Sequence, residues 1–392
     1  MTSIKQAVIL AGGLGTRLRP LTDIIPKPMV LVNGKPFLEY LVELLKRNGI
    51  QEIVMLLGYM PEKITEYFGD GSKFGVKITY SVTGIDDETG TRIKKAGAML
   101  EKDFLLLYCD NYWPLDLDKL VSFHKAKGLP ATVTVYSNKD NFTQNNVKVS
   151  EGIAEKYDPS RSLPGLNGVD IGFFILGKEI LKMMPEENFS FEKTIISKLV
   201  EEKKVAGFMT NHKYYSIGNL ERLPATEEYL KPKKIVFLDR DGVINEKPPK
   251  ADYVKSLEEF KFLPGAVLGM KNLTEKGHKI FIISNQAGIG RCLMTESDLN
   301  TIHEKMVLEL AKSGVAISGI YYCPHHWEEN CECRKPKPGM FFRAAYEHSI
   351  DLTKSIFIGD DERDAEAGEA AWIKTILVRP DFGLLEISKA LP

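Results

Sequence analysis

The sequence predicts an α/β protein of two domains in tandem. Its 392 residues exceed one ordinary domain, since domains average about 150 residues. In both halves short apolar runs alternate with helical patterns, which is typical of parallel sheets covered by helices. The alternation restarts at Lys234, after a charged stretch with a proline at 231–234 that is typical of an exposed linker. We therefore expect domains at residues 1–230 and 234–392.

The apolar pattern of the first half predicts strands separated by at least one amphipathic helix. Apolar residues recur at helical spacing from Phe37 to Leu45, and Gly49 is placed to end that helix. Four runs rich in Val, Ile and Leu predict strands, at Ala7–Ala11, Glu52–Gly58, Val76–Val82 and Phe104–Tyr108. These elements predict a parallel sheet covered on both faces.

The second half shows the same alternation. Thr295 and Asp298 form a capping box with Asp in place of Glu, which predicts a helix start. Five apolar runs predict strands, at Ile235–Leu238, Lys279–Ile283, Ile317–Tyr322, Ser355–Ile358 and Thr375–Val378.

The composition favours a cytoplasmic enzyme and disfavours nucleic-acid or membrane partners. A formal net charge of −1 offers no excess of cations to nucleic-acid phosphates. No stretch approaches the roughly 18 consecutive apolar residues that span a bilayer. The first apolar run covers only Ala7–Ala11, so we expect no secretory signal. Five cysteines in so long a chain predict no disulfide framework.

The segment FLDRDGVIN places two carboxylates at the end of a predicted buried strand. Asp239 follows the strand and Asp241 comes two residues later, at the sheet edge where α/β folds bind ligands. Neighbouring carboxylates repel, and a divalent cation removes that penalty and screens a phosphate dianion. Asp239 could then attack phosphorus to give an aspartyl-phosphate, while Asp241 protonates the leaving alkoxide and later activates water. The alternative is a polar turn between strand and loop.

A second strand is followed by SNQAGIGR, which suits a cradle for phosphoryl oxygens. Ser284 supplies a hydroxyl, Asn285 and Gln286 supply amides, and the glycines leave backbone N–H groups accessible. This segment supports phosphoryl transfer.

Two further segments complete the set. CRKPKPGM supplies the cations Arg334 and Lys335. GDDERD follows another predicted strand with Asp360 and Asp361, which can complete a magnesium shell of oxygens. Each signal is weak alone, but four in this order at strand ends disfavour the polar-turn alternative.

Together these segments resemble the four motifs of the haloacid dehalogenase superfamily of phosphatases. The nearest resemblance is to the D-glycero-D-manno-heptose-1,7-bisphosphate 7-phosphatase family, which is shared with histidinol-phosphate phosphatase. It covers residues 234–380, including DYV at Asp252–Val254, FLPG at Phe262–Gly265 and CPHH at Cys323–His326. One departure is Cys292, where the family usually has glycine.

The resemblance implies a Rossmann-like phosphatase domain with a zinc loop, and a role for each matched residue. It implies Asp239 as nucleophile, Asp241 as acid/base, Ser284 and Lys335 as holders of the phosphoryl group, and Arg334 as a substrate contact. The magnesium ligands that it implies are Asp239, Asp360 and the Asp241 carbonyl, with Asp361 as a weaker ligand.

Three of the five cysteines crowd into one short stretch with an imidazole. The C-x-H…C-x-C set matches a closed tetrahedral zinc site, formed by Cys323, His325, Cys331 and Cys333. The alternatives are reduced cysteines packed in a loop, and His326 in place of His325 as the ligand. The family resemblance also implies structural zinc here, which would fix the loop that delivers Arg334 and Lys335.

A glycine-rich loop follows the first predicted strand of the chain. Its small residues let the backbone approach a triphosphate and donate N–H bonds to it. The residues placed to do so are Ala11, Gly12, Gly13, Gly15 and Thr16. Arg17 can neutralise the β- and γ-phosphates, and Lys27 can place a point charge on the α-phosphate. With RLRPLT and PKP behind it, the loop predicts a nucleotide site.

This half is similar to the sugar-1-phosphate nucleotidyltransferases, most nearly the mannose- and heptose-1-phosphate guanylyltransferases, over residues 4–230. The resemblance implies a Rossmann-like domain in which a sugar 1-phosphate attacks the α-phosphorus of a nucleoside triphosphate, GTP for the guanylyltransferases, and expels pyrophosphate. The matched residues are the metal ligand Asp110 with Asn111, the pair Glu155 and Lys156 near the sugar phosphate, and Ser190–Lys193.

Several residues depart from that family pattern. Ser216 stands where the family has a second metal-binding aspartate, and a hydroxyl is a poorer magnesium ligand than a carboxylate. Arg92 and Ile93 stand where small residues normally lie against the nucleotide, Cys109 replaces a glycine, and Tyr157 replaces a proline. Two hypotheses follow: an active transferase, and a domain that only binds nucleotide or sugar phosphate.

The two domains together suggest consecutive reactions. A 7-phosphatase acting on a 1,7-bisphosphate makes the free 1-phosphate that a nucleotidyltransferase needs. We therefore expect magnesium and structural zinc as cofactors, and sugar phosphates and a nucleoside triphosphate as substrates. A third hypothesis changes the phosphatase substrate to histidinol phosphate or another small phosphomonoester.

Overall fold

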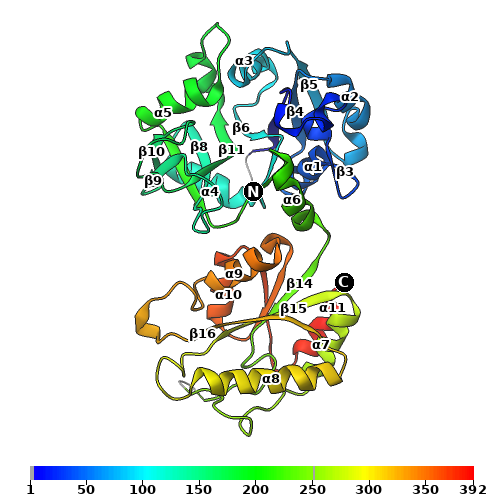
Figure 1. Cartoon of the computed structure of the whole chain (residues 1–392), viewed down its shortest axis with the longest axis vertical. Helices are drawn as coiled ribbons and strands as arrows, with labels where there is room; N and C mark the ends of the chain where they lie inside the picture. The colour runs from blue at the N-terminus through cyan, green and yellow to red at the C-terminus, as the bar shows by residue number, and fades with distance from the viewer. Residues whose placement is uncertain (1–3, 250–251) are drawn as a thin grey trace. The chain divides into compact units, whose positions relative to one another are not determined.

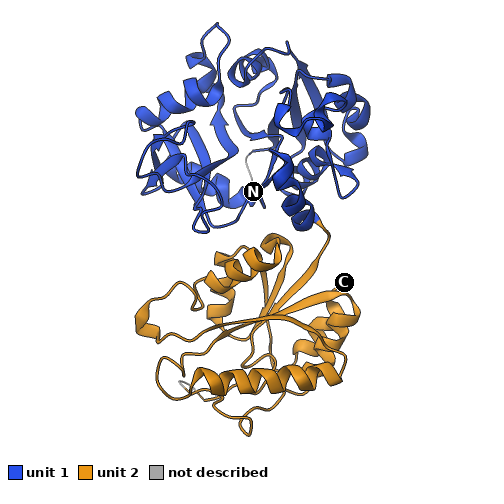
Figure 2. Cartoon of the chain, viewed as in Figure 1, with its two compact units in different colours: residues 1–230 blue, residues 231–392 orange. Residues whose placement is uncertain are grey.

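The computed structural model describes residues 4–249 and 252–392, which divide into two compact units, Met1–Leu230 and Lys231–Pro392 (Figure 2). Figure 1 labels the helices and strands of each unit. Each unit has its own main sheet and its own apolar core.

A nine-stranded sheet forms the centre of the first unit, in the order β5-β4-β1-β6-β11-β8-β12-β10-β9. Its strands are β1 (Gln6–Ala11), β4 (Glu52–Leu57), β5 (Lys77–Val82), β6 (Asp103–Tyr108), β8 (Ala131–Tyr136), β9 (Val147–Ser150), β10 (Ile153–Tyr157), β11 (Val169–Gly177) and β12 (Val205–Thr210). Two small sheets pair β2 (Leu31–Val32) with β3 (Lys35–Pro36), and β7 (Asn111–Tyr112) with β13 (Tyr215–Ser216). The four predicted strands are confirmed as β1, β4, β5 and β6.

The prediction of a parallel sheet is wrong for part of this unit. β1 runs parallel to β4 and β6, but β11 runs antiparallel to both β6 and β8. Residues 171–177 of β11 are buried throughout. A strand buried on both faces is a continuous apolar run whichever way it points, so its direction cannot be predicted from its apolar pattern.

The helices of the first unit are α1 (Phe37–Arg47), α2 (Pro61–Phe68), α3 (Thr89–Lys95), α4 (Leu117–Lys127), α5 (Ser197–Glu201) and α6 (Leu223–Leu230). α1 confirms the predicted amphipathic helix, because its apolar residues are buried. Two residues beyond its end, Gly49 has a φ of 80°, in the left-handed region that favours glycine.

The second unit is built on a five-stranded sheet in the order β16-β15-β14-β17-β18. The strands are β14 (Lys234–Leu238), β15 (His278–Asn285), β16 (Ile317–Cys323), β17 (Ile356–Gly359) and β18 (Lys374–Leu377), and each adjacent pair is parallel. All five predicted strands are therefore confirmed, and so is their parallel arrangement.

Helices cover both faces of this sheet. Alternate residues of a strand point to opposite faces, so Phe237 packs with α9 (Gly339–His348) and α10 (Glu362–Ala370). Its neighbours Val236 and Leu238 pack on the other face, with α7 (Ala266–Glu275), α8 (Glu296–Lys312) and α11 (Leu384–Ala390).

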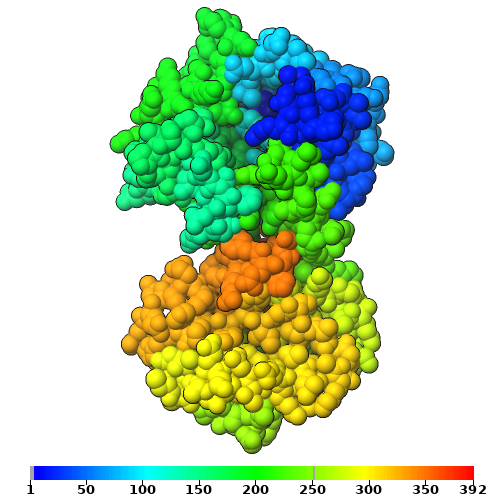
Figure 3. All heavy atoms as spheres, viewed as in Figure 1, coloured from blue at the N-terminus to red at the C-terminus, as the bar shows by residue number. Residues whose placement is uncertain are grey.

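The start of α8 confirms the predicted capping box. The Thr295 hydroxyl accepts from the Asp298 amide, and the Asp298 carboxylate accepts from the Thr295 amide. In the space-filling view α8, in yellow, lies on the surface of its unit (Figure 3). Within residues 4–249 and 252–392, no helix is both long enough and apolar enough to cross a bilayer.

The carboxyl ends of the parallel strands carry the motifs of both units. In the second unit β14 leads into Asp239, β15 contains Ser284, and β17 leads into Asp360. In the first unit β1 leads into Gly12, and β6 is followed by Asp110. Both candidate sites therefore lie at sheet edges, as the sequence predicts.

Candidate active sites

In the second unit a buried carboxylate contacts a buried ammonium. Asp239 Oδ2 lies 2.9 Å from Lys335 Nζ, and the Lys335 side chain is only 3% exposed. The Asp239 amide donates to the Ile358 carbonyl of the neighbouring strand at 2.9 Å, which fixes the turn after β14. Burial raises the pKa of Asp239, and the nearby Asp364 adds to that rise while Lys335 opposes it.

Asp241 is held by donors on three sides. Arg240, whose side chain is fully buried, donates to both oxygens of this carboxylate at 3.0–3.1 Å. Asn245 Nδ2 donates to Oδ1 at 2.8 Å, and Gln286 Nε2 donates to Oδ2 at 2.9 Å. This network orients the carboxylate in the same cavity as Asp239.

The GDDERD segment contributes a carboxylate that sequence reasoning missed. Asp364 lies within a group with Asp239 and Asp360 whose carboxylate oxygens are all within 4.8 Å of one another. One Asp364 oxygen binds Lys335 Nζ at 2.7 Å, and the other accepts the amides of Asp360 and Asp361. Asp361 and Asp364 form the capping box of α10, and their D-x-x-D spacing was the signal available in the sequence.

Asp361 lies apart from that group. Its carboxylate caps α10 by accepting from the Arg363 amide, and it also binds the Arg363 guanidinium at 2.9 and 3.0 Å. Lys247 Nζ lies 2.7 Å from Asp360 and 3.4 Å from Asp361. The structure thus brings Asp360 to Asp239, and it occupies Asp361 with helix capping.

The loop after β15 supplies side chains to the cavity but fewer backbone donors than its glycines suggest. The amides of Gln286 and Gly290 donate to the carbonyls of Cys323 and Pro324, so these two amides are not available to a phosphate. Ser284 and Asn285 line the cavity. The Asn285 side chain also binds the backbone of Lys335, at 3.0 and 3.1 Å, and so positions that residue.

These groups border a cavity of about 680 Å³. Its lining includes the carboxylates of Asp239, Asp241 and Asp360 and the cations Lys247, Arg334 and Arg363. It also includes the apolar or aromatic residues Pro248, Pro249, Tyr253 and Trp327. Within the described part of the chain, the buried Arg334 Nη1 has no hydrogen-bond partner. That unsatisfied donor suits an anionic ligand.

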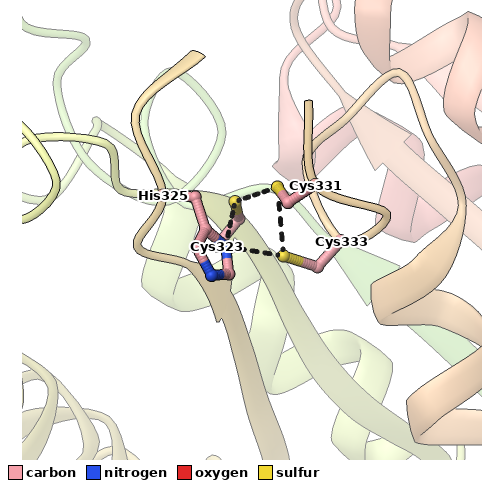
Figure 4. Close-up of side chains that lie close together, drawn as sticks. All are labelled: Cys323, His325, Cys331 and Cys333. Atoms are coloured by element: carbon pink, nitrogen blue, oxygen red, sulfur yellow. Dashed lines mark hydrogen bonds between the residues drawn. The ribbon is translucent and has the colours of Figure 1, made fainter. Parts of the chain in front are cut away.

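A loop beside this cavity gathers the predicted zinc ligands (Figure 4). The donor atoms of Cys323, His325, Cys331 and Cys333 all lie within 4.8 Å of one another, with contacts of 3.2–3.6 Å around the group. A tetrahedron with metal–sulfur bonds of about 2.3 Å has edges of about 3.8 Å, close to these spacings. His326 is outside the group, and its Nδ1 accepts from the Glu328 amide.

In the first unit the glycine loop lies between β1 and the short helix Thr16–Leu18. Gly15 has a φ of 66°, and a Cβ there would lie 2.8 Å from the Lys27 side chain, so only glycine fits. Lys27 Nζ forms an ion pair with Asp110 Oδ2. Lys27, the predicted phosphate-binding residue, thus packs against the glycine loop and pairs with Asp110, the predicted metal ligand.

A second cavity, of about 390 Å³, lies over this loop. Among its lining residues are the predicted Gly12, Gly13, Gly15, Thr16, Arg17, Lys27 and Asp110, and also Ser190 and Glu192. Ala11 lies at the buried end of β1 beside them. Asn111 donates to the Ile171 carbonyl at 3.0 Å, so its side chain links β7 to β11.

Arg92 and Ile93, which stand where small residues normally lie against the nucleotide, have two different environments in the structure. Ile93 is fully buried in the apolar core, which corrects the prediction that it lies against the nucleotide. The buried Arg92 guanidinium donates to the carbonyls of Gly12, Leu57 and Ile85 and to the Thr83 hydroxyl. Arg92 therefore supports the glycine loop from beneath while lining the cavity.

Where the family has a second metal-binding aspartate, this chain has Ser216, whose hydroxyl contacts the Arg222 guanidinium. Ser216 pairs with Asn111 across the β7–β13 ladder, and the Ile217 amide donates to the Asp110 carbonyl at 3.0 Å. Ser216 is buried, and its hydroxyl accepts from Arg222 Nη1 at 3.3 Å. A guanidinium thus approaches the position of the family's second metal ligand.

Comparisons with known proteins match each unit to a protein family. A model of the nucleotidyl transferase family matches residues 6–231, and a model described as polynucleotide kinase 3 phosphatase matches residues 234–372. The second unit is 39% identical over 164 residues to D-glycero-β-D-manno-heptose-1,7-bisphosphate 7-phosphatase of Pasteurella multocida, an alignment covering 40% of this chain and 88% of that protein. This chain belongs to the nucleotidyl transferase family and, through its second unit, to the heptose bisphosphate phosphatase family.

The nucleotidyltransferase unit has relatives of its own. It is 33% identical over 223 residues to a probable glucose-1-phosphate cytidylyltransferase of Bacillus subtilis, covering 51% of this chain and 86% of that protein. Its fold matches the crystal structure of HddC from Yersinia pseudotuberculosis, with 27% identity, a TM-score of 0.50, and coverage of 58% of this chain and all of HddC. HddC has also been crystallised with GMP-PN.

Two predicted residues of the nucleotidyltransferase unit lie away from its cavity. Glu155 and Lys156 are exposed on β10, outside the cavity lining, and Glu155 pairs with Lys148 at 2.7 Å. The neighbouring Tyr157 hydroxyl instead donates to Asp170 at 2.6 Å, and burial raises the pKa of Asp170 to about 6. Asp170 was missed because an isolated acid in an apolar run carries no motif.

The structure accommodates both cysteines that stand where the two families usually have glycine, Cys109 and Cys292. Cys109 is buried after β6 of the nucleotidyltransferase unit. Cys292 of the phosphatase unit has a φ of 56°, a backbone conformation that favours the glycine usual in the family.

Proposed function

We propose that the chain catalyses two consecutive reactions of nucleotide-sugar synthesis. The phosphatase unit removes the 7-phosphate of D-glycero-D-manno-heptose 1,7-bisphosphate, and the nucleotidyltransferase unit converts the resulting 1-phosphate to a nucleotide sugar. The observation that carries the proposal is the buried Asp239–Lys335 pair beneath a 680 Å³ cavity with further cations on its walls.

The phosphatase reaction proceeds by two displacements at phosphorus. Lys335 neutralises the incoming phosphate, and a bond forms from Asp239 to phosphorus as the bond to the sugar oxygen breaks. Asp241 in its acid form gives its proton to that oxygen, then takes a proton from water. The activated water attacks phosphorus, which releases inorganic phosphate and restores Asp239.

The residues of this site fit magnesium. Among the described residues, the three carboxylates of Asp239, Asp360 and Asp364 outnumber the two ammonium groups that contact them, those of Lys335 and Lys247. Asp364 uses both oxygens within the protein, whereas the buried Asp360 Oδ1 lacks a hydrogen-bond partner in the described ranges. Asp239 and Asp360 would therefore hold the ion, together with the Asp241 carbonyl. Bound magnesium would neutralise the carboxylates and screen the phosphate dianion.

The Cys323, His325, Cys331 and Cys333 group fits structural zinc. Four protein ligands leave no open position for substrate or water, so the ion would be structural and not catalytic. Cys333 directly precedes Arg334 and Lys335 in the chain. The zinc site would thus fix the loop that carries both cations.

The nucleotidyltransferase reaction needs positioning and charge neutralisation. The glycine loop would bind the triphosphate, with Arg17 on its outer phosphates and Lys27 on the α-phosphate. The 1-phosphate oxygen then bonds to the α-phosphorus as pyrophosphate leaves. Asp110 would hold magnesium at that phosphate, and its ion pair with Lys27 keeps both groups in place.

We propose GTP as the nucleotide. The support is the likeness of this unit to HddC, which binds GMP-PN, whereas the Bacillus subtilis relative is named for cytidylyl transfer. A coupled assay tests both the reaction and the base. Heptose 1,7-bisphosphate of each anomer is supplied with each of the four nucleoside triphosphates, while phosphate and pyrophosphate are measured. We expect phosphate without nucleotide, and pyrophosphate only when GTP and bisphosphate are both present.

A second candidate function is a phosphatase whose first unit only binds nucleotide or sugar phosphate. The Ser216–Arg222 contact favours it, because a cation lies where a metal-binding carboxylate is expected. Phosphate release without any pyrophosphate would support this candidate. Faster turnover of histidinol phosphate than of either bisphosphate would change the assigned phosphatase substrate.

A further inference from the structure

The lining of the phosphatase cavity includes two aromatic side chains that no part of the proposed chemistry uses, Tyr253 and Trp327. Trp327 lines the cavity and is 45% exposed. It belongs to the zinc loop, two residues after the ligand His325. Single exposed apolar residues are common on protein surfaces, so exposure alone indicates nothing. The way in which Trp327 is held is more informative.

The local backbone fixes Trp327 in a short helical turn, Trp327–Glu329. The Glu329 carboxylate accepts from the His326 amide at 2.6 Å, and His326 Nδ1 accepts from the Glu328 amide at 3.2 Å. The His326 ring also lies 4.4 Å from the Trp327 ring. The turn is thus held by two side-chain hydrogen bonds, and the indole contacts its neighbour with the ring planes tilted by 37°.

The loop after β15 also contacts Trp327, through Arg291. The Arg291 guanidinium lies 4.7 Å from the Trp327 ring centre and 5.9 Å from that of Tyr253, within the range of cation–π contact. Gly290 permits this approach, because a Cβ there would lie 2.4 Å from the His326 amide nitrogen. Gly288 similarly leaves room for the Tyr253 ring. The absence of a side chain at Gly288 and Gly290 therefore lets the Tyr253 ring and the backbone before Trp327 approach this loop closely.

The cavity lining combines two kinds of chemistry. Asp239, Lys335 and Asp360 are charged, whereas Pro248, Pro249, Tyr253 and Trp327 supply apolar surface. At about 680 Å³ the cavity falls within the range of sites for whole small molecules, which is about 300–1,000 Å³. A phosphate group alone would leave most of it to the part of the substrate that carries the phosphate.

We propose that Trp327 is a specificity-determining residue that packs against the carbon skeleton of the sugar while the phosphate lies at Asp239. An aromatic face presents a large, rigid apolar surface with a negative quadrupole, which suits the C–H groups of a pyranose ring. Arg291, His326 and the zinc loop hold the indole in place for that contact. The proposal rests on the proposed phosphatase function and names the residue that selects a sugar at its site.

The test uses full-length, zinc-loaded protein carrying Trp327→Ala or Trp327→Phe. Phosphate release is measured from heptose 1,7-bisphosphate and from glycerol 3-phosphate, which has no ring. Trp327→Ala should raise KM for the bisphosphate about tenfold, equivalent to about 1.4 kcal/mol, with kcat within about twofold. It should leave kcat/KM for glycerol 3-phosphate unchanged, and Trp327→Phe should restore most of the bisphosphate affinity. Leu308→Ala on α8, 54% exposed and outside the cavity lining, is the matched control.

A binding measurement supplies a second readout. In an Asp239→Asn background, the bisphosphate should change tryptophan emission, and Trp327→Phe should remove that change although Trp113 and Trp372 remain. Equal losses on both substrates in Trp327→Ala would overturn the proposal and leave only a structural role. An unchanged KM for the bisphosphate would also overturn it. Failure of the proposed function is recognised separately, because the unsubstituted protein would then not hydrolyse the bisphosphate.

Discussion

Lys335 Nζ lies 2.9 Å from Asp239 Oδ2, and both side chains are buried at the carboxyl end of β14. Burial alone lowers the pKa of a lysine, but Asp239 and Asp364 together raise that of Lys335 and keep it charged. A buried charge that loses its partner is costly, so these groups depend on one another. The arrangement holds the proposed nucleophile within one hydrogen bond of the proposed phosphate-binding cation.

Asp239→Asn should abolish phosphatase turnover, lowering kcat by at least about 10⁴-fold, because the amide cannot form the aspartyl-phosphate. The change conserves volume and the amide oxygen can still accept from Lys335, so the fold should persist. Phosphate release and circular dichroism check these two expectations. Pyrophosphate release from GTP and heptose 1-phosphate should be unchanged. Turnover retained at the normal rate would exclude the covalent mechanism.

Asp364→Asn should lower phosphatase kcat about 10²-fold without removing the nucleophile. Its carboxylate anchors Lys335 at 2.7 Å and accepts two amides of the turn that carries Asp360, so its loss misplaces both groups. Asp361→Asn is the matched control, since asparagine caps a helix about as well as aspartate and should change stability and kcat little. Equal kcat losses in the two variants would contradict a special role for Asp364.

Ser216→Asp should raise nucleotidyltransferase kcat about tenfold or more if the missing carboxylate limits the reaction. Pyrophosphate release at several magnesium concentrations measures the effect. The new carboxylate would also lie near Arg222, which contacts the Ser216 hydroxyl at 3.3 Å. Ser216→Asn, of similar size but without the charge, is the control. No gain in Ser216→Asp would show that another difference limits the transferase.

Cys333→Ser should lower the zinc content and reduce phosphatase activity about tenfold or more, because the adjacent loop carries Arg334 and Lys335. Metal analysis and phosphate release provide the two measurements. Cys292→Ser changes an exposed cysteine outside the group and should retain full zinc. Full zinc occupancy in Cys333→Ser would contradict the assignment of this ligand.

Asp170 should make the nucleotidyltransferase unit less stable as the pH rises from about 4 to about 6. Its carboxyl has a pKa near 3.8 in the unfolded chain, and burial raises this pKa to about 6 in the fold, so the folded state binds more protons in that interval. Asp170→Asn should therefore stabilise the protein by up to about 3 kcal/mol at pH 8 and by little at pH 4. Calorimetric unfolding at both pH values measures the difference. A gain of equal size at both would contradict the role of ionisation.

Much of the phosphatase unit could be predicted from the sequence. Its five strands are short apolar runs that end in polar motifs, and a parallel sheet places those strand ends at one edge. The capping box at Thr295 is local in the chain, so it too was readable. Asp364 was not recognised, because a helical carboxylate is common and only packing brings it to Lys335.

The nucleotidyltransferase unit was predicted less completely. The glycine loop and Asp110 could be recognised because each follows a strand and matches a local motif. The antiparallel direction of β11 and the Tyr157–Asp170 contact could not be, because they depend on strands distant in sequence. Lys156 was expected near the sugar phosphate, but β10 leaves it exposed outside the cavity lining.

The amino-acid sequence by itself determined the two-domain α/β class, the strand-end motifs and the Cys/His group of the proposed zinc site, because these depend on short-range patterns of polarity and spacing. Only the tertiary structure decided that Arg92 lies beneath the glycine loop, that Arg222 reaches Ser216, and that Trp327 borders the phosphatase cavity. The physical reason is that a side chain's partners are set by which distant segments pack against it, and no local pattern encodes that packing.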